Sequence, residues 1–229
     1  MINDLTVVAV IPARTGSKGL TRKNVVPFGG RPLIQWTIDA ARASDYVDHI
    51  VVTTDDPVVI ALAKGQGLTI VNRPAHLAED TTTAAEVIAH VLEQAFGEDL
   101  LVYLQPTSPL RLPADIDGCL DLLVSSGAPG VVSVVAVREA PEWMYRFEEG
   151  STALRPLVAD HQSFRRQDLP PTVRLNGAVY CASQQSLRPD GRFLRLQLAG
   201  YEMPSERSID IDDLLDLEAA EREFHLAHP

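Results

Sequence analysis

Residues 5–24 read LTVVAVIPARTGSKGLTRKN, and they join two segments of opposite character. The first, Leu5–Ile11, is an apolar run of the kind typical of a buried β-strand. The second, Ile11–Asn24, holds two glycines, two arginines and two lysines but no acidic residue. The whole chain of 229 residues carries a formal net charge of −11. Positive charge therefore gathers at the end of one predicted strand of an acidic protein.

Apolar strand patterns alternate with helical patterns from this first strand onward. The predicted strands span residues 5–11, 49–54, 68–71, 100–104 and 131–137, and the predicted helices span 32–43, 57–64, 83–96 and 113–124, with an N-cap from Thr81–Thr83 for the third helix. Uniformly apolar strands that alternate with helices indicate a parallel sheet covered on both faces. Because crossovers are right-handed, we expect an α/β doubly wound, mostly parallel sheet. Ligands of such sheets bind beyond the carboxyl ends of the strands.

The alternation stops after residue 137. Residues 138–171 are rich in proline and charge, and they predict an excursion from the sheet that serves as a lid, a hairpin or a dimerisation arm, joined by part of 181–200. Strand character returns at 176–181 and 208–211, and a closing helix is expected at 214–226. We expect one domain over residues 1–229.

Composition excludes several classes of function. A net charge of −11 argues against general nucleic-acid binding, which needs a basic face. No apolar run approaches the roughly 20 residues of a membrane helix. The two cysteines, Cys119 and Cys181, have no metal-site spacing and indicate a reduced protein. The first residues lack the basic region of a signal peptide, so a cytoplasmic location is expected.

The basic loop suits an anion. A glycine-containing loop that leaves a strand offers several backbone N–H groups to one phosphate. Arg14, Lys18, Arg22 and Lys23 add the charge that a triphosphate requires. The spacing matches neither the P-loop nor the GxGxxG pattern. A solvated basic loop with glycines at its turns is the competing interpretation.

A pair of carboxylates recurs near the end of the chain, in SIDIDDLLDL, residues 208–217. Asp210 and Asp212 are two residues apart, so an extended backbone presents both on one side, with Ile209 and Ile211 toward the core. Paired carboxylates hold Mg²⁺, which also takes substrate phosphate oxygens as ligands. The alternative is an ordinary amphipathic strand in which Asp213 caps the next helix.

Two further motifs carry polar groups. LQPTSPLR, residues 104–111, follows a predicted strand and presents Gln105, Thr107 and Ser108, although a rigid loop with a solvated Arg111 is the simpler explanation. FRRQDLP, residues 164–170, and Arg174 could grip a carboxylate or form a surface cluster. No nucleophile with a partnering base stands out, which favours direct displacement at phosphorus.

Together these segments resemble the cytidylyltransferases that activate nine-carbon acidic sugars, the CMP-sialic acid synthetase (acylneuraminate cytidylyltransferase) family. The resemblance runs almost end to end. It is carried, in the family's order, by IPARTGSKGLTRKN, IVVTTDD, RPAHLAEDT, LQPTSPLR, RRQDLP, NGAVY and SIDIDDLLDLEAAE. It implies Mg²⁺-dependent transfer of CMP from CTP to the anomeric hydroxyl of a nonulosonic acid, with release of pyrophosphate, by a homodimer whose arms reach toward each other.

The resemblance also implies roles for individual residues. The triphosphate would be bound by Arg14, Ser17, Lys18 and Lys23, and the cytidine by Asn24 and Arg73. The catalytic residues would be Arg14, Lys23, Asp210 and Asp212, of which Asp210 and Asp212 would also hold Mg²⁺. The acidic sugar would be faced by Gln105, Arg166, Tyr180 and Phe193. The group that takes the hydroxyl proton stays open between an aspartate near the metal and a metal-bound hydroxide. Arg22 has no implied role, and a solvated charge is expected there.

Departures from the family pattern leave the sugar open. Where sialic-acid-specific bacterial members carry a lysine in the arm, this chain has Pro141–Met144, and Trp143 cannot supply that charge. Leu194 replaces a second aromatic residue after Phe193. Legionaminate or another nonulosonate therefore competes with sialic acid. A nucleotidyltransferase for a shorter acid sugar such as 3-deoxy-octulosonate, or an inactive nucleotide-binding module, are the alternative functions.

Overall fold

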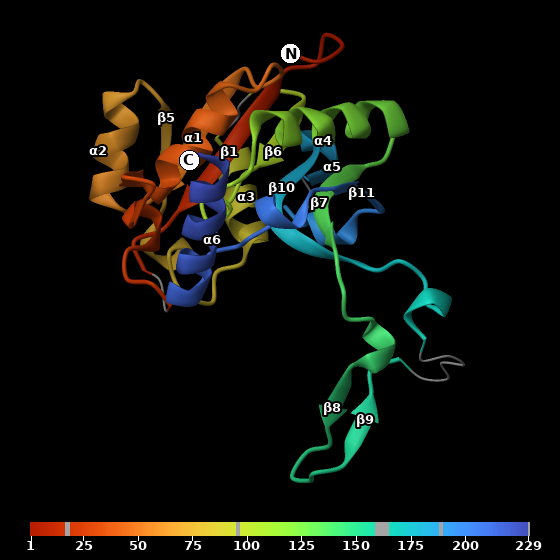
Figure 1. The fold of residues 1–229 in the computed structure, drawn as a ribbon. Helices are drawn as coiled ribbons and strands as arrows, with labels where there is room; N and C mark the ends of the chain where they lie inside the picture. Colours follow the sequence, from red (N-terminus) through yellow and green to blue (C-terminus); the bar gives the residue numbers. More distant parts are fainter. Residues whose placement is uncertain (17–18, 95–96, 159–164, 188–189, 229) are drawn as a thin grey trace.

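The chain folds around one seven-stranded sheet in the order β11-β7-β10-β6-β1-β4-β5 (Figure 1). The computed structural model describes residues 1–16, 19–94, 97–158, 165–187 and 190–228. The strands are β1 Val7–Ala13, β4 His49–Thr54, β5 Thr69–Asn72, β6 Leu100–Tyr103, β7 Gly130–Ala136, β10 Val173–Ser183 and β11 Leu198–Glu202. All neighbours pair in parallel except β10, which runs antiparallel between β6 and β7.

Helices cover both faces of this sheet, as the alternating pattern predicts. They are α1 Leu33–Arg42, α2 Pro57–Gly65, α3 Ala84–Leu92, α4 Pro113–Ser126, α5 Gln184–Leu187 and α6 Leu214–Ala227. The short elements are β2 Pro27–Phe28, β3 Arg31–Pro32, β8 Tyr145–Phe147 and β9 Leu154–Pro156, with single 3₁₀ turns η1 Lys23–Val25, η2 Ala75–Leu77, η3 Pro141–Trp143, η4 Arg166–Asp168, η5 Phe193–Arg195 and η6 Ser205–Arg207. None of the helices in the described ranges is long and apolar enough to cross a membrane.

Strand β1 shows how the core is divided. Its alternate residues Val7, Ala9 and Ile11 pack in one cluster with α1, α2 and α4, while Val8 and Val10 pack on the other face with α3 and α5. All five side chains are almost completely buried. Apolar residues at every strand position therefore reflect a sheet that is buried on both sides. The expected doubly wound α/β class is confirmed.

Two expectations about strands are wrong. Residues 208–211 form no strand; the Ile211 N–H donates one hydrogen bond of 2.8 Å to the Thr107 carbonyl, and no ladder continues from it. The edge position belongs instead to β11, which the sequence pattern missed because Leu198–Glu202 has a central glycine and is only partly buried. Consequently residues 181–183 and 198–200 belong to the sheet, and the chain between them contains α5 and η5.

The excursion between β7 and β10 contains a small hairpin. Strands β8 and β9 pair antiparallel and project away from the body of the domain (Figure 1). Large apolar side chains on the hairpin are exposed, among them Phe147 at 74% and Leu154 at 56%. The hairpin predicted within residues 138–171 is thus present, and its role in dimerisation stays a prediction.

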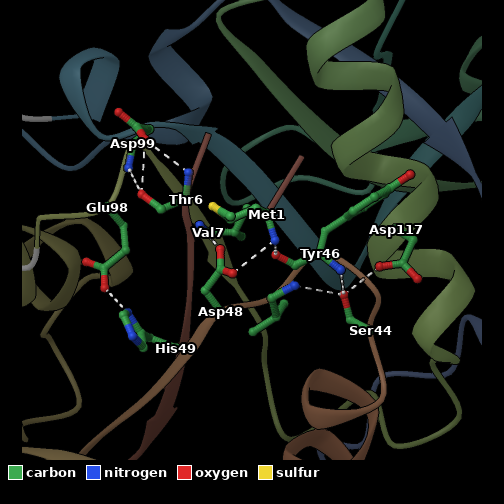
Figure 2. Close-up of polar contacts among 11 residues, drawn as sticks. Met1, Thr6, Val7, Ser44, Tyr46, Asp48, His49, Glu98, Asp99 and Asp117 are labelled. Atoms are coloured by element: carbon green, nitrogen blue, oxygen red, sulfur yellow. Dashed lines mark hydrogen bonds and ion pairs between the residues drawn. The ribbon is translucent and has the colours of Figure 1, made fainter. Parts of the chain in front are cut away.

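Polar contacts satisfy backbone groups at the end of the sheet where β1 begins. Figure 2 shows Asp99, which accepts from both the backbone N–H and the hydroxyl of Thr6 at 3.0 Å, and Asp48, which accepts from the Val7 N–H at 2.8 Å. The Met1 ammonium also contacts Asp48, at 3.0 Å. These carboxylates satisfy backbone donors at the strand starts. The opposite edge, where the parallel strands end, carries the site described below.

The contacts of Asp48 predict acid sensitivity. Burial raises the pKa of Asp48, but the hydrogen bond from Val7 and the Met1 ammonium outweigh it, so that the pKa lies below its usual 3.8. A carboxylate with a lowered folded-state pKa stabilises the protein above the unfolded-state pKa, and this contribution is lost as pH falls through the folded-state value. The Asp48→Asn variant should therefore be less stable than the parent near neutral pH, and the gap should narrow as pH drops below about 4. Urea unfolding at pH 7, 5, 4 and 3 measures it; a gap that does not change with pH would contradict the assignment.

Candidate active site

Two adjoining cavities lie at the edge of the sheet where β1, β4, β5 and β6 end. We call the first, of about 230 Å³, the polar cavity. It brings together seven of the predicted residues: Arg14, Lys23, Asn24, Arg73, Gln105, Asp210 and Asp212. The second, of about 420 Å³, is the aromatic cavity, and its walls include the predicted Gln105, Tyr180 and Phe193. Gln105 and Tyr103 line both cavities, so the two form one continuous site.

The loop after β1 contributes cations that already have acidic partners. Lys23 donates to the Asp212 carboxylate at 2.8 Å, and Arg14 to Asp80 at 2.6 Å. Asn24 is buried and donates to the Arg14 carbonyl at 2.9 Å, which fixes the backbone beneath the Arg14 side chain. The site therefore combines positive and negative groups within one cavity.

The adjacent acids at the end of β4 hold both ends of this loop. Asp55 accepts from the Thr15 N–H at 2.8 Å, and the buried Asp56 accepts from Arg22 at 3.2 Å while it caps α2 through the Val58 N–H. Arg22 adopts the left-handed conformation, with φ at 55°. Arg22 is exposed, as expected of a solvated charge, and its ion pair with Asp56 also joins the loop to the start of α2.

Asp210 and Asp212 both reach the polar cavity from the segment between η6 and α6. Burial raises the pKa of Asp210, a hydrogen bond with Thr107 opposes the rise, and its Oδ1 has no hydrogen-bond partner among the described residues. The Asp212 side chain is 75% exposed. An unpartnered carboxylate oxygen beside a second carboxylate is the donor set that suits Mg²⁺.

No group of three acidic, histidine or cysteine residues with metal-site geometry occurs in the ranges that the structure describes. A Mg²⁺ ion held by Asp210 and Asp212 would consequently need further oxygen ligands from water or from a bound phosphate. Asp213, in turn, caps α6 by accepting from the Leu215 and Asp216 N–H groups. The predicted cap and the predicted carboxylate pair are compatible, because they use different residues.

Buried polar groups fix the segment that carries these carboxylates. Asn176 donates to the Ser208 hydroxyl at 2.9 Å and accepts from the Ser133 hydroxyl at 2.6 Å. Arg207 binds both oxygens of the buried Asp115, at 2.7 and 3.1 Å. The segment thus reaches the site as an extended strand would, but it is held by side chains instead of a ladder.

The aromatic cavity is built on a row of rings. The Tyr180 ring lies 6.5 Å from that of Tyr103 and 5.7 Å from that of Phe193. Burial raises the pKa of Tyr180, which keeps its phenol neutral. Arg192 and Arg195 line the same cavity and pair with Asp190 at 3.8 and 2.7 Å. Sequence reasoning missed both arginines, although they stand on either side of Phe193 and Leu194.

Three predicted residues cannot be placed in the site. Ser17 and Lys18 lie outside the described residues. Arg166 begins η4 in the excursion, and its side chain is likewise outside the described part. Their predicted roles stay predictions.

The fold is that of the α/β nucleotidyltransferases, and the two cavities lie beyond the carboxyl ends of its parallel strands. Residues 8–222 match the cytidylyltransferase family, and the chain belongs to that family. Its CMP-sialic acid synthetase branch is supported by N-acylneuraminate cytidylyltransferases from Streptococcus agalactiae, 32% identical over 207 residues, and from Escherichia coli, 32% identical over 214 residues. These matches cover 90% and 93% of the chain but 50% and 51% of the relatives, so the chain spans about half their length.

A relative of matching length and a solved structure complete the comparison. The CMP-N,N'-diacetyllegionaminic acid synthase of Legionella pneumophila is 31% identical over 229 residues, which covers 97% of each chain. A solved CMP:2-keto-3-deoxy-manno-octonic acid synthetase in complex with CTP superposes with a TM-score of 0.74 at 18% identity, over 97% of this chain and 99% of the other. At this identity the superposition supports the fold.

Two glycines of the basic loop should respond differently to alanine. A Cβ on Gly19 would lie 2.0 Å from the Asp212 carbonyl oxygen, whereas a Cβ on Gly16 would meet only the Arg14 guanidinium, at 3.7 Å. We expect Gly19→Ala to lower the free energy of unfolding by about 1–3 kcal/mol, because backbone must move. Gly16→Ala is the matched control, with an expected change within about 1 kcal/mol. Urea unfolding of both variants tests this, and equal stabilities would refute the close packing of Gly19 on Asp212.

Proposed function

We propose that the chain transfers CMP from CTP to the anomeric hydroxyl of a nonulosonic acid, with Mg²⁺ as cofactor and pyrophosphate as the second product. One observation carries the proposal. A polar cavity with three cations and two carboxylates opens directly into an aromatic cavity, and Gln105 lies at the junction. A nucleotide triphosphate in the first cavity would present its α-phosphorus to a sugar hydroxyl in the second.

The polar cavity has the groups that a cytidine triphosphate requires. Arg14 and Lys23 would exchange their carboxylate partners for phosphate oxygens. Arg73 is buried and donates to the Thr53 carbonyl at 2.9 Å, while its Nε has no hydrogen-bond partner among the described residues. This arrangement supports the assignment of Arg73, with Asn24, to the nucleoside end. Positioning and charge stabilisation are the main work in phosphoryl transfer.

Asp210 and Asp212 would hold the Mg²⁺ ion. When bound, such an ion neutralises phosphate charge and acidifies a coordinated hydroxyl. The protein's own contribution is to hold both carboxylates against the phosphate loop, through the Lys23–Asp212 ion pair and the buried anchors of the 207–211 segment. The identity of the group that takes the hydroxyl proton stays open.

The aromatic cavity supports an acidic, acylated sugar. Arg192 and Arg195 supply positive charge for a carboxylate. Ile88, Phe193 and Leu194 form an apolar wall, which favours acyl methyl groups over a hydroxylated tail. The equal-length relative named for N,N'-diacetyllegionaminic acid agrees with this chemistry. We therefore propose a diacylated nonulosonate in preference to N-acetylneuraminate.

A homodimer is part of the proposal, and we expect it in the cytoplasm with no membrane or nucleic-acid partner. The exposed Trp143, Phe147 and Leu154 of the excursion supply apolar surface for a second copy. Light scattering of the parent and of a Phe147→Ser variant would test the oligomeric state.

A substrate panel tests the proposed reaction. CTP and Mg²⁺ are held at saturation, and pyrophosphate release is measured with N,N'-diacetyllegionaminate, pseudaminate, N-acetylneuraminate and 3-deoxy-octulosonate. We expect the fastest release with a diacylated nonulosonate. Release with the octulosonate alone would establish the shorter-sugar activity instead. No release with any of the four, and no Mg²⁺-dependent thermal stabilisation by CTP, would overturn the proposal.

The carboxylate pair predicts the effect of a single substitution. Asp212→Asn should lower turnover by about a hundredfold or more, because it removes a charged ligand of the cation and leaves only a neutral amide. Its fold should stay intact, since the Asp212 side chain is largely exposed. Asp213→Asn is the matched control, because asparagine also caps a helix well. Substantial activity in Asp212→Asn would show that residue 212 is not a metal ligand.

Substitution of Arg192 should change KM for the sugar but not KM for CTP. Arg192→Gln should raise KM for the acidic sugar by about tenfold, the loss expected for one charge-assisted hydrogen bond. KM for CTP should stay within about twofold, because Arg192 lines only the aromatic cavity. Arg42→Gln, at the far end of α1, is the charge-matched control. An unchanged KM for the sugar would remove Arg192 from the site.

A further inference from the structure

Arg111 is a buried cation, not the solvated end of a loop. Its side chain is 3% exposed, although it ends the LQPTSPLR segment just before α4. Burial lowers the pKa of Arg111 to about 10. The nearby buried carboxylate Asp115 is bound by Arg207 and accepts from the Leu112 N–H. Arg111 therefore serves some purpose other than a simple ion pair.

The Arg111 guanidinium joins three elements around the site. It donates to the Ala178 carbonyl of β10 at 2.5 Å, to the Gln105 carbonyl after β6 at 3.3 Å and to the Thr37 hydroxyl of α1 at 2.7 Å. Gln105 lines both cavities, and Ala178 follows Gly177 in the irregular part of β10. One side chain thus holds two backbone positions, one within β10 and one just after β6.

Gly177 is the point where the two halves of the site touch. Its φ is +78°, and a Cβ placed on it would lie 3.1 Å from both the Gln105 Oε1 and the Asp210 Oδ2. The Gln105 amide and the Asp210 carboxylate therefore both lie beside the face of Gly177 on which a side chain would stand. Any movement of residues 177–178 relative to residue 105 would change the spacing between these two side chains.

We infer that Arg111 is a positioning residue that sets the sugar-facing Gln105 amide against the Asp210 carboxylate. It acts by holding the Gln105 and Ala178 carbonyls at a fixed separation, so that the Gln105 side chain enters the aromatic cavity beside Gly177. An arginine suits this task because its planar fork donates in several fixed directions, whereas a lysine ammonium is a point charge. The inference rests on the proposed function for the meaning of the aromatic cavity.

The Arg111→Lys variant tests this role, because it keeps the charge but loses the fork. We expect KM for the preferred nonulosonate to rise by about tenfold or more while the dissociation constant for CTP with Mg²⁺, from calorimetry, stays within about twofold. Thr37→Val is the second variant. It removes one acceptor of the guanidinium and leaves both carbonyl contacts, so KM for the sugar should rise less than in Arg111→Lys.

A destabilised control separates positioning from folding. Leu120→Ala removes a fully buried side chain of α4 that lines neither cavity, so it should lower the melting temperature without a selective change in KM for the sugar. The inference is supported if Arg111→Lys raises KM for the sugar and leaves the dissociation constant for CTP unchanged. If Arg111→Lys does not fold, the same selective rise in KM for the sugar in Thr37→Val supports it. An unchanged KM for the sugar in the folded variants, or the same pattern in Leu120→Ala, overturns it. Failure of the parent enzyme to release pyrophosphate would instead overturn the proposed function.

Discussion

The hydrogen bonds of one buried amide hold the site together. Asn176 is 1% exposed, and its side chain has no access to water, so its donors and acceptor must find partners inside the protein. The amide oxygen accepts from Ser133 on β7, and the amide nitrogen donates to Ser208 on the segment that carries the carboxylates. The amide oxygen also accepts from the Ala178 N–H at 3.2 Å, which stabilises the irregular turn in β10. The sheet, the turn at Gly177 and the acidic segment can therefore form only as one unit.

The charges of the site follow a second constraint. The basic residues of the loop after β1 stand in an acidic protein, and Arg14, Arg22 and Lys23 each contact an aspartate from a different part of the chain. Only one of these pairs, Arg22–Asp56, includes a buried carboxylate. Exposed ion pairs contribute little to stability, so Arg14 and Lys23 can change partners at small cost, while Arg22 keeps the loop in place. Arg22 thus differs from Arg14 and Lys23, the cations proposed to bind phosphate, in the burial of its carboxylate partner.

The parts of the fold that could be predicted from the sequence are those with a strong local signal. The buried strands β1, β4 and β6, the helices α1, α2, α3, α4 and α6, and the cap at Thr83 follow from periodicity and from side-chain chemistry close in the chain. The antiparallel course of β10, the edge strand β11 and the non-strand character of 208–211 depend on pairing between distant segments. A local pattern contains no information about such pairing.

The same distinction applies to the site. Arg14, Lys23, Asp210 and Asp212 could be found because a charged residue beside a predicted strand end is conspicuous, and the structure gathers them in one cavity. The burial of Arg111 and the ion pair of Arg22 could not be predicted, because each depends on an acceptor that is far away in the chain. Asp56 accepts from Arg22, and the Ala178 carbonyl accepts from Arg111. Arg192 and Arg195 were not predicted as site residues, because only the folded structure places them beside the aromatic cavity.

The contact between Lys23 and Asp212 has a consequence for the order in which ligands enter. A phosphate that arrives alone would take Lys23 and leave the Asp212 carboxylate uncompensated, and a divalent cation that arrives alone would take Asp212 and leave the Lys23 ammonium uncompensated. A nucleotide that brings its own cation replaces both partners in one exchange, and no charge is left unbalanced. With the roles proposed for Lys23 and Asp212, this ion pair would favour entry of the metal–nucleotide complex over entry of either component alone.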